Sequence, residues 1–372
     1  MILQFGAGNF LRGFAELIVH QLNLKLNPGP GKIVVIQSTG KDRANAINAS
    51  IGKYHVAIQG LEQGKVIDET IEVASISHAL HAGSQWAEIV EAGRHPDLKL
   101  ILSNTTEAGL TLDPADITFT GRAPVSFPAK LLGVLIERKQ ANQPAPWIVP
   151  CELIESNADR LRDLVLEQAI LWNTPDDLIA WIKHECRWVN TLVDRIVAGR
   201  PTKHPLLESD PLLISAEPFC LWAVETKDAN FPLAQHPKVV TVSDITPYTL
   251  RKVRILNGAH SALVSHAMEV SGVKTVRDCV EHQKIGPWVE KLLFEEIVPV
   301  LEGRCDDPKG FACETLDRFR NPFLDHQLSA IALNHESKVA VRLQPTLEEF
   351  RQRFGKEPPL LSELLGPRRV IG

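Results

Sequence analysis

Apolar residues in the first 245 positions form short runs separated by stretches of helical period, a pattern typical of parallel βαβ units. The runs predicted to be strands are Ile2–Phe5, Lys32–Gln37, Lys99–Ser103, Trp147–Pro150 and Lys238–Val242. The segments Asn9–Leu26 and Asn157–Trp172 carry apolar residues at helical spacing. Two alternating runs within Tyr54–Ile76 predict an inserted hairpin. The pattern therefore predicts an α/β fold with a parallel sheet.

The pattern changes after Pro247, where strand signals become rare. Long amphipathic segments follow, and they predict helices at Tyr248–Gly272, Ile285–Glu302 and Glu314–Leu333. We place a domain boundary near Thr246. The predicted domains are residues 1–245, which would bind a dinucleotide, and residues 246–372, which would be mainly helical.

Length and charge narrow the function classes. A chain of 372 residues is long enough for two domains. The formal net charge of -5 gives no global basic field for nucleic acid, although a local basic pocket could still hold a small anion. No apolar run reaches the ~20 residues of a membrane-spanning helix. We therefore expect a small-molecule enzyme with neither a nucleic-acid nor a membrane partner; the oligomeric state stays open.

The N-terminus and the cysteines indicate the compartment. Met1–Gly6 reads as a strand entering a turn, which leaves no space for a signal peptide. The six cysteines are scattered without C-x-x-C spacing, which favours reduced thiols over a disulfide scaffold or a zinc site. We expect a cytoplasmic protein without a bound metal.

A glycine pair follows the first predicted strand, in Phe5-Gly6-Ala7-Gly8-Asn9. Glycines at a first βα junction permit a tight turn and let the backbone approach a pyrophosphate, which the helix N-terminus then attracts. The third glycine of the usual fingerprint is absent, because Leu11 stands there. The glycine pair lies at the first strand–helix junction of an alternating chain. This position, more than the motif itself, favours a dinucleotide site over a plain strand–helix turn.

The end of the second strand leaves the cofactor choice open. Lys41 and Arg43 suit the 2′-phosphate of NADP, whereas Asp42 suits the ribose hydroxyls of NAD. A solvated charged loop explains the same residues equally well.

The clearest chemical group is Lys252, Asn257 and His260 on one predicted helix. At 100° per residue, Asn257 lies about 140° and His260 about 80° from Lys252, so the three share one broad face. Reduction of a ketone by hydride needs a proton donor for the alkoxide and hydrogen-bond donors to stabilise its charge. Lysine suits the first role and asparagine the second, while histidine can hold a substrate hydroxyl. An ordinary amphipathic helix is the alternative.

Gly258 lies between these residues, in the middle of the predicted helix. Glycine there costs about 1 kcal/mol relative to alanine. We therefore expect a close approach to the backbone at this point.

The motif Lys252-x4-Asn257-Gly258-x-His260 resembles the signature of the mannitol dehydrogenase family, the polyol-specific long-chain dehydrogenases. The N-terminal Gly6-x-Gly8-x-Phe10-x-Arg12 is similar to the cofactor turn of that family. Further stretches resemble a branch that interconverts tagaturonate and altronate: Ser103–Gly109, Ser126–Lys130, Pro150–Ile154, Leu192–Val197 and Arg318–Pro322. The resemblance runs from Phe5 to about Pro345, in the expected order.

The resemblance implies a Rossmann-type doubly wound first domain, a helical second domain, and a zinc-independent active site in the cleft between them. It also implies NAD as cofactor, with NADP left open, and a sugar acid or polyol as substrate. By position, Lys252 would be the general acid/base, Asn257 would polarise the carbonyl and His260 would bind substrate. The residues implied for cofactor binding are Phe5, Gly6, Gly8, Asn9, Phe10, Leu11, Arg12, Asn104, Thr106 and Glu107.

Further residues are implied near the substrate, each with a structural alternative. Asp194 and Arg195 would lie beside the site or form an ion pair, and Glu107 could instead cap a helix. The residues of the second domain that could meet a carboxylate or hydroxyls are Arg318, Asn321 and His326, with Lys338 and Arg342 as weaker candidates. A structural cluster of helices explains these five equally well.

Two departures from the family pattern bear on function. Many relatives read Cys-Asp-Asn where this chain has Cys151-Glu152-Leu153, and leucine cannot donate a hydrogen bond to an oxyanion. Asn257 would then act with water or with Asn157. The chain also ends several helices before the reductases of the branch usually do, which leaves a natural short form or a truncated, inactive chain as alternatives. The competing substrates are fructuronate/mannonate and mannitol/fructose.

Overall fold

The structure, a computed structural model, describes residues 1–105, 109–268 and 270–366. The chain divides into two units. The first unit comprises Met1–Ile58, Glu69–Ala216 and Cys220–Ile245; the second comprises Gln59–Asp68, Glu217–Phe219 and Thr246–Gly372. Two short segments from the predicted first domain, residues 1–245, thus belong to the second unit, which hydrophobic periodicity cannot reveal.

The main sheet of the first unit has six parallel strands in the order β5-β2-β1-β6-β7-β8. The strands are β1 Ile2–Phe5, β2 Ile33–Gln37, β5 Ile76–His81, β6 Leu100–Ser103, β7 Trp147–Pro150 and β8 Arg187–Trp188. Counted along this sheet the order is 3-2-1-4-5-6, the arrangement of a Rossmann-type doubly wound fold. The predicted α/β class is therefore confirmed, although the sequence did not identify β5 as a strand.

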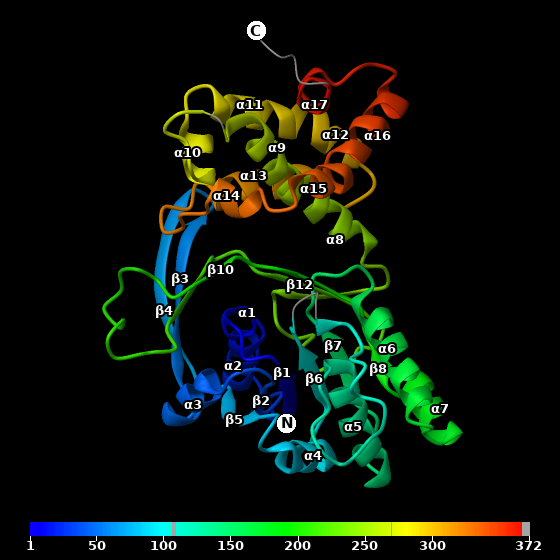
Figure 1. The fold of residues 1–372 in the computed structure, drawn as a ribbon. Coiled ribbons are helices and arrows are strands. Elements are labelled where there is room, and N and C mark those ends of the chain that lie inside the picture. Colours follow the sequence, from blue (N-terminus) through cyan, green and yellow to red (C-terminus); the bar gives the residue numbers. More distant parts are fainter. Residues whose placement is uncertain (106–108, 269, 367–372) are drawn as a thin grey trace. The chain divides into compact units, whose positions relative to one another are not determined.

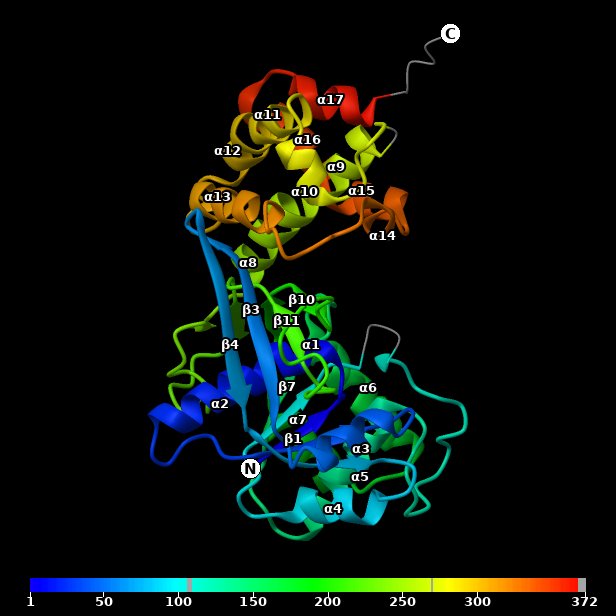
Figure 2. The same ribbon diagram turned by 90° about the vertical axis from the view of Figure 1, so that its left-hand side faces the viewer.

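Seven helices of the described residues surround this sheet (Figures 1 and 2). They are α1 Asn9–Gly13, α2 Ala15–Lys25, α3 Asp42–Ala49, α4 Trp86–Arg94, α5 Phe127–Gln140, α6 Asn157–Leu171 and α7 Asp176–His184. The predicted single helix Asn9–Leu26 was wrong, because the chain breaks it at Phe14, whose φ of −129° and ψ of −89° are not helical. The Phe14 ring is buried against Phe10 and Trp222, at 5.0 Å from each ring centre.

Two smaller sheets complete the strands, with orders β10-β11-β3-β4 and β13-β12-β9. Their strands are β3 Tyr54–Glu62, β4 Lys65–Val73, β9 Thr191–Asp194, β10 Val197–Gly199, β11 Ile214–Ala216, β12 Leu221–Glu225 and β13 Val239–Val242. The predicted hairpin is present as β3 and β4. Its two-residue turn, Gln63-Gly64, has positive φ at both positions, as the favoured hairpin turns require.

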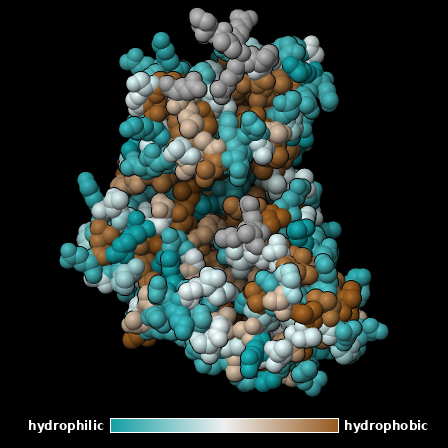
Figure 3. Space-filling model, in the orientation of Figure 1, coloured by the Kyte–Doolittle hydropathy of each residue, from teal (hydrophilic) through white to brown (hydrophobic). Residues whose placement is uncertain are grey.

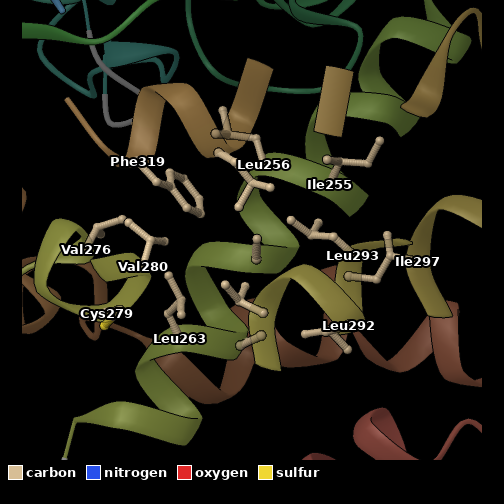
Figure 4. Close-up of a cluster of buried hydrophobic side chains, with 14 of the residues drawn as sticks. Ile255, Leu256, Leu263, Val276, Cys279, Val280, Leu292, Leu293, Ile297 and Phe319 are labelled. Carbon is tan, nitrogen blue, oxygen red and sulfur yellow. The ribbon is translucent and has the colours of Figure 1, made fainter. Parts of the chain in front are cut away.

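The second unit is built from helices around one apolar core. The helices are α8 Thr246–Arg251, η2 Lys252–Asn257, α9 Gly258–Ala267, α10 Val276–Glu281, α11 Ile285–Lys291, η3 Leu292–Ile297, α12 Val298–Leu301, α13 Pro308–Phe319, α14 Leu328–Ile331, α15 His335–Arg342, α16 Gln344–Phe354 and α17 Pro359–Leu365. The segments η2 and η3 are π-helices. Figure 4 shows Ile255 and Leu256 of η2 within the core, beside Leu293 of η3 and Phe319 of α13.

One predicted helix of this unit was wrong. The segment Glu314–Leu333 is not continuous, because α13 ends at Phe319 and α14 begins at Leu328. Pro322 has no N–H to continue a helix, and the Asn321 side chain accepts a hydrogen bond from the Phe323 N–H at 2.9 Å. The amphipathic pattern persisted across a turn because both helices face the same core.

The surface and the thiols give two further findings. Hydrophilic side chains are interspersed with hydrophobic ones over the face drawn in Figure 3. Among the described residues, none of the helices combines the length and the apolar character that crossing a membrane would demand. All six cysteines are free, and four of them are buried.

Candidate active site

The Gly6–Gly8 turn has the geometry of a dinucleotide site. Gly6 has φ +115°, and a Cβ there would lie 2.7 Å from the Asn104 carbonyl oxygen. Gly8 immediately precedes α1, and a Cβ built on it would have no atom within 4 Å. Gly6 is therefore required by the fold of the turn, whereas Gly8 leaves open space in front of a helix N-terminus, where a phosphate can bind.

A pocket of about 500 Å³ lies at this turn. Its lining includes Gly6, Ala7 and Gly8 with residues that follow β2 and β6, such as Ser38 and Thr105. In a sheet of this order the connections reverse direction between β1 and β6, and ligands bind at the carboxyl ends of the strands at that point. The pocket is thus located where this fold binds nucleotides.

A buried network supports the turn from below. The Gln4 side chain donates to the Gly6 carbonyl at 2.9 Å and to a Glu16 carboxyl oxygen at 2.7 Å. The Tyr54 hydroxyl lies 2.7 Å from the other Glu16 oxygen and 2.8 Å from the Arg12 carbonyl. Burial raises the pKa of Glu16. The sequence motifs did not point to Gln4, Glu16 or Tyr54, although a glutamine inside an otherwise apolar strand indicates a buried polar contact.

Several other residues predicted to bind the cofactor have side chains that contact the protein itself. Phe5 and Leu11 have buried side chains in the core, so that only their backbone faces the turn. Phe10 stacks on Phe14. Arg12 is buried and donates to the Leu212 carbonyl at 2.5 Å and to the Asn9 side chain at 2.6 Å. These contacts make Arg12 a support of the turn.

The segment after β6 is held by a residue that departs from the family pattern. Glu152 is buried and accepts hydrogen bonds from the Ser103 hydroxyl at 3.0 Å and from the Thr105 N–H at 2.9 Å. Burial raises the Glu152 pKa. Asn104 lines the pocket and donates to the Cys151 carbonyl at 2.7 Å.

Thr106 and Glu107, both predicted to contact the cofactor, lie outside the described residues.

Asn157 does not offer the second oxyanion donor considered from the sequence. Its amide nitrogen lies within 3.3 Å of oxygens of Pro150, Glu152 and Thr191, and its oxygen accepts from the Thr191 N–H at 3.0 Å. Leu153 is exposed. Because the Asn157 side chain is buried and occupied, a role at a reacting oxygen would break existing hydrogen bonds.

Asp194 and Arg195 lie at the end of β9 and just beyond it. Asp194 is buried, and Arg195 donates to the Gly13 carbonyl at 3.0 Å, a contact within the first unit.

Lys252 and Asn257 begin and end the π-helix η2. The Gly258 N–H donates to the Val253 carbonyl, a spacing of five residues that places position i+5 one hydrogen-bonded turn from position i. Lys252 and Asn257 therefore lie closer to a common face than the α-helical separation of about 140° predicts. Both side chains are half-buried, whereas those of Arg254, Ile255 and Leu256 are buried.

Two arginines hold η2 against the corner between α15 and α16. Arg254 donates to the Thr346 hydroxyl at 2.8 Å and to Glu349 at 3.1 Å. Arg342 donates to the Ser261 hydroxyl at 3.1 Å and lies 3.5 Å from the Asn257 carbonyl. A Cβ on Gly258 would be 3.5 Å from Leu343, an ordinary contact. The approach expected at Gly258 is present but leaves room for a methyl group.

His260 is buried at the start of α9, and its Nε2 has no hydrogen-bond partner among the described residues. Its ring packs against Phe319 at 4.5 Å and meets His326 edge-on at 4.9 Å. Burial lowers the pKa of His260, and the positive charges of His326, Arg318, Arg342 and Lys338 lower it further. A neutral imidazole with one unpaired nitrogen can form a hydrogen bond with a hydroxyl.

Arg318 is engaged by the protein itself. Its Nε and Nη2 donate to the two Glu217 carboxylate oxygens at 3.0 and 2.8 Å, and both side chains are about 2% exposed. Asn321 is buried and donates to the Gln59 carbonyl at 3.0 Å. The sequence-based choice of Arg318 as first anchor for a substrate carboxylate stays a prediction, and Glu217 occupies one edge of its guanidinium.

Lys338 and Arg342, the weaker candidates, are two further cations of the second unit. Arg342 contacts the end of η2, and Lys338 donates to the Ile331 carbonyl at 2.8 Å. Both act electrostatically on His260. We call these two side chains, Lys338 and Arg342, the cationic group. Such a group favours an anionic ligand.

A nucleotide turn at the switch point of a 3-2-1-4-5-6 sheet defines the class of dinucleotide-binding folds, and comparison with known proteins identifies the family. Residues 1–236 match the mannitol dehydrogenase Rossmann domain, and residues 244–366 match the mannitol dehydrogenase C-terminal domain. The chain therefore belongs to the mannitol dehydrogenase family.

Two curated relatives carry the same name. The altronate oxidoreductase of Bacillus subtilis is 38% identical over 97% of this chain and 77% of its own length. That of Yersinia enterocolitica is 39% identical, with the same coverage.

Solved structures share the fold. A D-sorbitol dehydrogenase in substrate-free form matches 98% of this chain and 78% of its own, with a TM-score of 0.84 and 23% identity. The mannitol 2-dehydrogenase of Pseudomonas fluorescens, in ternary complex with NAD and D-mannitol, matches 98% of this chain and 77% of its own, with a TM-score of 0.78 and 22% identity.

Proposed function

We propose that this protein is an NAD-dependent oxidoreductase that interconverts tagaturonate, a keto sugar acid, and altronate. The observation that carries the proposal is the cationic group near the unpaired His260 Nε2. His260 lies in α9, which directly follows the π-helix of Lys252 and Asn257. Hydroxyls and a carboxylate are what those groups bind well. The curated relatives named altronate oxidoreductase support the same substrate.

The first unit would bind the dinucleotide. The residues at its turn fit this group, because Gly6 gives the required backbone conformation and Gly8 leaves room for a pyrophosphate at the N-terminus of α1. NADH, when bound, supplies the hydride for the ketone carbon. Ser103 and Glu152 keep the Asn104–Thr105 segment at the wall of the pocket.

The second unit would bind the substrate and handle its proton. Lys252 donates a proton to the carbonyl oxygen during reduction and accepts it during oxidation. Asn257, one π-helical turn away, donates its amide N–H to the same oxygen and stabilises the developing charge. His260 holds a neighbouring hydroxyl through Nε2. Lys338 and Arg342 attract the carboxylate, a role that we assign to them in place of Arg318.

The charges of Lys338 and Arg342 favour an acid substrate over a neutral polyol. A carboxylate that meets two cations in a partly buried site gains charge-assisted hydrogen bonds that a hydroxymethyl group cannot form. We also propose that the protein works in the cytoplasm, because its six thiols are free and suit a reducing compartment.

A substrate panel with absorbance of the reduced cofactor tests the proposal. The panel contains tagaturonate, fructuronate and fructose, with altronate and mannitol in the reverse direction. We expect kcat/KM for tagaturonate to exceed that for fructose by about 100-fold or more, the effect of two lost charge contacts. Better turnover of fructose or mannitol would overturn the acid assignment, and better turnover of fructuronate would replace the sugar.

The variant Lys338→Met with its control Arg277→Met locates the carboxylate. Arg277 is also a cation of the second unit, but it pairs with Asp325. Lys338→Met should raise KM for the keto acid about tenfold while leaving that for fructose unchanged, and Arg277→Met should change neither. An equal rise for both substrates would assign Lys338 to structure.

A further inference from the structure

Glu16 is a carboxyl group that the fold buries completely beside the turn Gly6–Gly8. It lies in the first turn of α2, and the Ser75 hydroxyl donates to its backbone carbonyl at 2.8 Å. The buried Arg12 guanidinium donates elsewhere, to two neutral oxygens. Within the described part of the chain, Glu16 therefore has neutral hydrogen-bond partners and no ion pair. An ionised carboxylate is costly in such a place.

One oxygen of this carboxyl group is a hydrogen-bond acceptor. The Gln4 Nε2 donates to the Glu16 Oε1 at 2.7 Å and to the Gly6 carbonyl at 2.9 Å. The Gly6 carbonyl can only accept, so the Gln4 atom that faces both oxygens must be the amide nitrogen with its two protons. Both protons are used in these contacts. Any proton of the Glu16 carboxyl group therefore lies on Oε2.

The second oxygen, Oε2, contacts the Tyr54 hydroxyl, which has only one proton. The Tyr54 Oη lies 2.7 Å from Oε2 and 2.8 Å from the Arg12 carbonyl oxygen. That carbonyl is a pure acceptor near the end of α1, where a helix cannot satisfy its own carbonyls. If the tyrosine proton goes there, the contact with Oε2 is a hydrogen bond only when Oε2 itself has a proton. An ionised Glu16 would leave a buried acceptor facing an acceptor.

We propose that Glu16 is a neutral carboxylic acid at pH 7 and that its proton positions the nucleotide turn. Oε2 donates its proton to Tyr54, which donates its own to the Arg12 carbonyl. Oε1 accepts from Gln4, which also holds the Gly6 carbonyl. One carboxyl group thus supports both ends of the segment from Gly6 to Arg12. Glu16 acts through Gln4 and Tyr54, so it is a positioning residue. The inference rests on the proposed function only in that a dinucleotide binds at this turn.

The titratable groups that act on this network are Arg12, Tyr54, Arg43 and Asp210. Burial raises the pKa of Glu16 and outweighs the positive charge of Arg12, which lowers it. The charges of Arg43 and Asp210 act on Arg12 in opposite directions. Burial raises the pKa of Tyr54 well above its usual value, so the hydroxyl keeps its proton. These directions agree with the proton count.

A second buried glutamate has the opposite set of partners and is the matched control. Glu296 of η3 is 3% exposed, and its two oxygens accept from the N–H groups of Leu360 and Leu361, each at 2.8 Å. Both neighbours are donors, which suits the ionised form. Burial raises the pKa of both glutamates. Their hydrogen-bond partners, rather than their burial, therefore distinguish the two.

Glu16→Gln and Glu296→Gln test the protonation state. A glutamine amide copies a neutral carboxyl group, with one donor side and one acceptor side. Glu16→Gln should therefore equal or exceed the unmodified protein in Tm at pH 7. Glu296→Gln should lower Tm by about 3 °C or more, because its amide N–H would face a backbone N–H. In infrared difference spectra, only Glu16→Gln should lose the C=O stretching band of a protonated carboxyl group.

The pH dependence of unfolding gives an independent readout. A neutral Glu16 keeps in the folded chain a proton that the unfolded chain, with a pKa near ~4.3, releases. Stability therefore falls as the pH rises above that value, until the folded group ionises. Between pH ~5 and ~7, the folding equilibrium constant of the unmodified protein should fall about tenfold per pH unit relative to that of Glu16→Gln. Urea unfolding measures this ratio, and a ratio that is constant with pH would overturn the proposal.

Tyr54→Phe tests the positioning role. It removes the link between Glu16 and the Arg12 carbonyl, so NADH binding, measured by fluorescence titration without any sugar acid, should weaken about tenfold or more. Glu16→Gln keeps the link, and its Kd should stay within about threefold of the unmodified value. Tyr248→Phe is the control, because Tyr248 lies in α8 of the second unit, and it should leave the Kd unchanged.

The remaining outcomes separate this inference from the proposed function. A Glu16→Gln variant that is less stable and loses a carboxylate band would show an ionised Glu16 and overturn the proposal. Unchanged NADH affinity in Tyr54→Phe would refute the positioning role. If the unmodified chain binds no dinucleotide, the proposed function and the positioning role both fail, while the infrared and pH results still decide the protonation state. Circular dichroism confirms that each variant is folded.

Discussion

The two units build their candidate sites from different materials. In the first unit the nucleotide turn is made of backbone: Gly6 and Gly8 lie within a few residues of β1 and α1, and local sequence specifies them. In the second unit the site is made of side chains. Their placement on η2 depends on contacts such as Arg254 with Thr346, which is 92 residues away in sequence. The geometry of a backbone site depends little on distant residues. The geometry of a side-chain site depends on the packing that holds those side chains in place.

The largest expected effect belongs to the side-chain site. Lys252→Ala should lower kcat for the keto acid by roughly 10²- to 10⁴-fold, because general acid–base catalysis supplies about that much. Cofactor affinity should stay within about twofold, since the lysine belongs to the other unit. Single-turnover kinetics and NADH titration measure the two quantities. Retention of more than about a tenth of the turnover would show that Lys252 is not the acid/base.

A pair of glycine variants tests the backbone site. Gly6→Ala should destabilise the protein by about 2 kcal/mol or more, because of the positive φ and the clash with the Asn104 carbonyl. Gly8→Ala should leave the free protein unchanged and weaken dinucleotide binding, because its Cβ enters open space. Urea unfolding and cofactor titration separate the two effects. Equal losses of stability would contradict the distinction drawn between these glycines.

Each unit also contains one buried histidine with a lowered pKa, His236 and His260. Burial brings the His236 pKa to about 4, below the value near 6.5 of an unfolded chain. Between these values the unfolded state takes up a proton that the folded state does not. The contribution of His236 to the free energy of unfolding is therefore complete above pH ~6.5. It falls as the pH drops toward 4, by about 2.5 kcal/mol at pH ~4.5.

His236→Gln and His260→Gln should each flatten part of this acid loss in unfolding experiments, but they should differ in catalysis. His236 has both ring nitrogens paired, with Gln21 and with the Lys238 N–H. Only His260→Gln should therefore raise KM. A matching rise in His236→Gln would remove the contrast between a structural and a substrate-binding histidine.

A smaller effect is expected where α16 holds η2. Glu349→Gln weakens the contact with Arg254, and it should lower kcat about tenfold through misplacement of Lys252 and Asn257, with unchanged NADH binding. Arg304→Gln is the control, since Arg304 meets the same carboxylate from the exposed side. If both variants act alike, or if Glu349→Gln changes only thermal stability, the packing at α16 does not position the π-helix.

The smallest effect concerns Gly258. Its backbone is helical and the neighbouring atoms leave room for a methyl group. Gly258→Ala should therefore stabilise the protein by up to about 1 kcal/mol, the helix-propensity difference, with little change in turnover. A strong loss of activity would mean that the ligand, rather than Leu343, approaches this position.

The sequence alone determined what depends on neighbours along the chain. Strands such as Ile2–Phe5 and Trp147–Pro150 were predicted with their observed bounds, because burial on both faces of a parallel sheet demands continuous apolar runs. The glycine turn and the Lys252–His260 motif were also readable, since each is short and its residue types suit one chemistry. The family resemblance followed from such local motifs.

Tertiary structure decided what depends on distant partners. Periodicity at 100° per residue did not reveal the π-helix, because the partners that hold it are distant in sequence. Arg254 of η2 contacts Thr346 of α16, 92 residues away, and Arg342 of α15 contacts Ser261 of α9, 81 residues away. It did not reveal the breaks at Phe14 and Asn321, because the flanking helices face the same cores. The partner of Arg318 was equally hidden, since Glu217 is 101 residues away. The sequence shows that a motif contains a charged arginine, but only the fold determines which carboxylate pairs with that arginine.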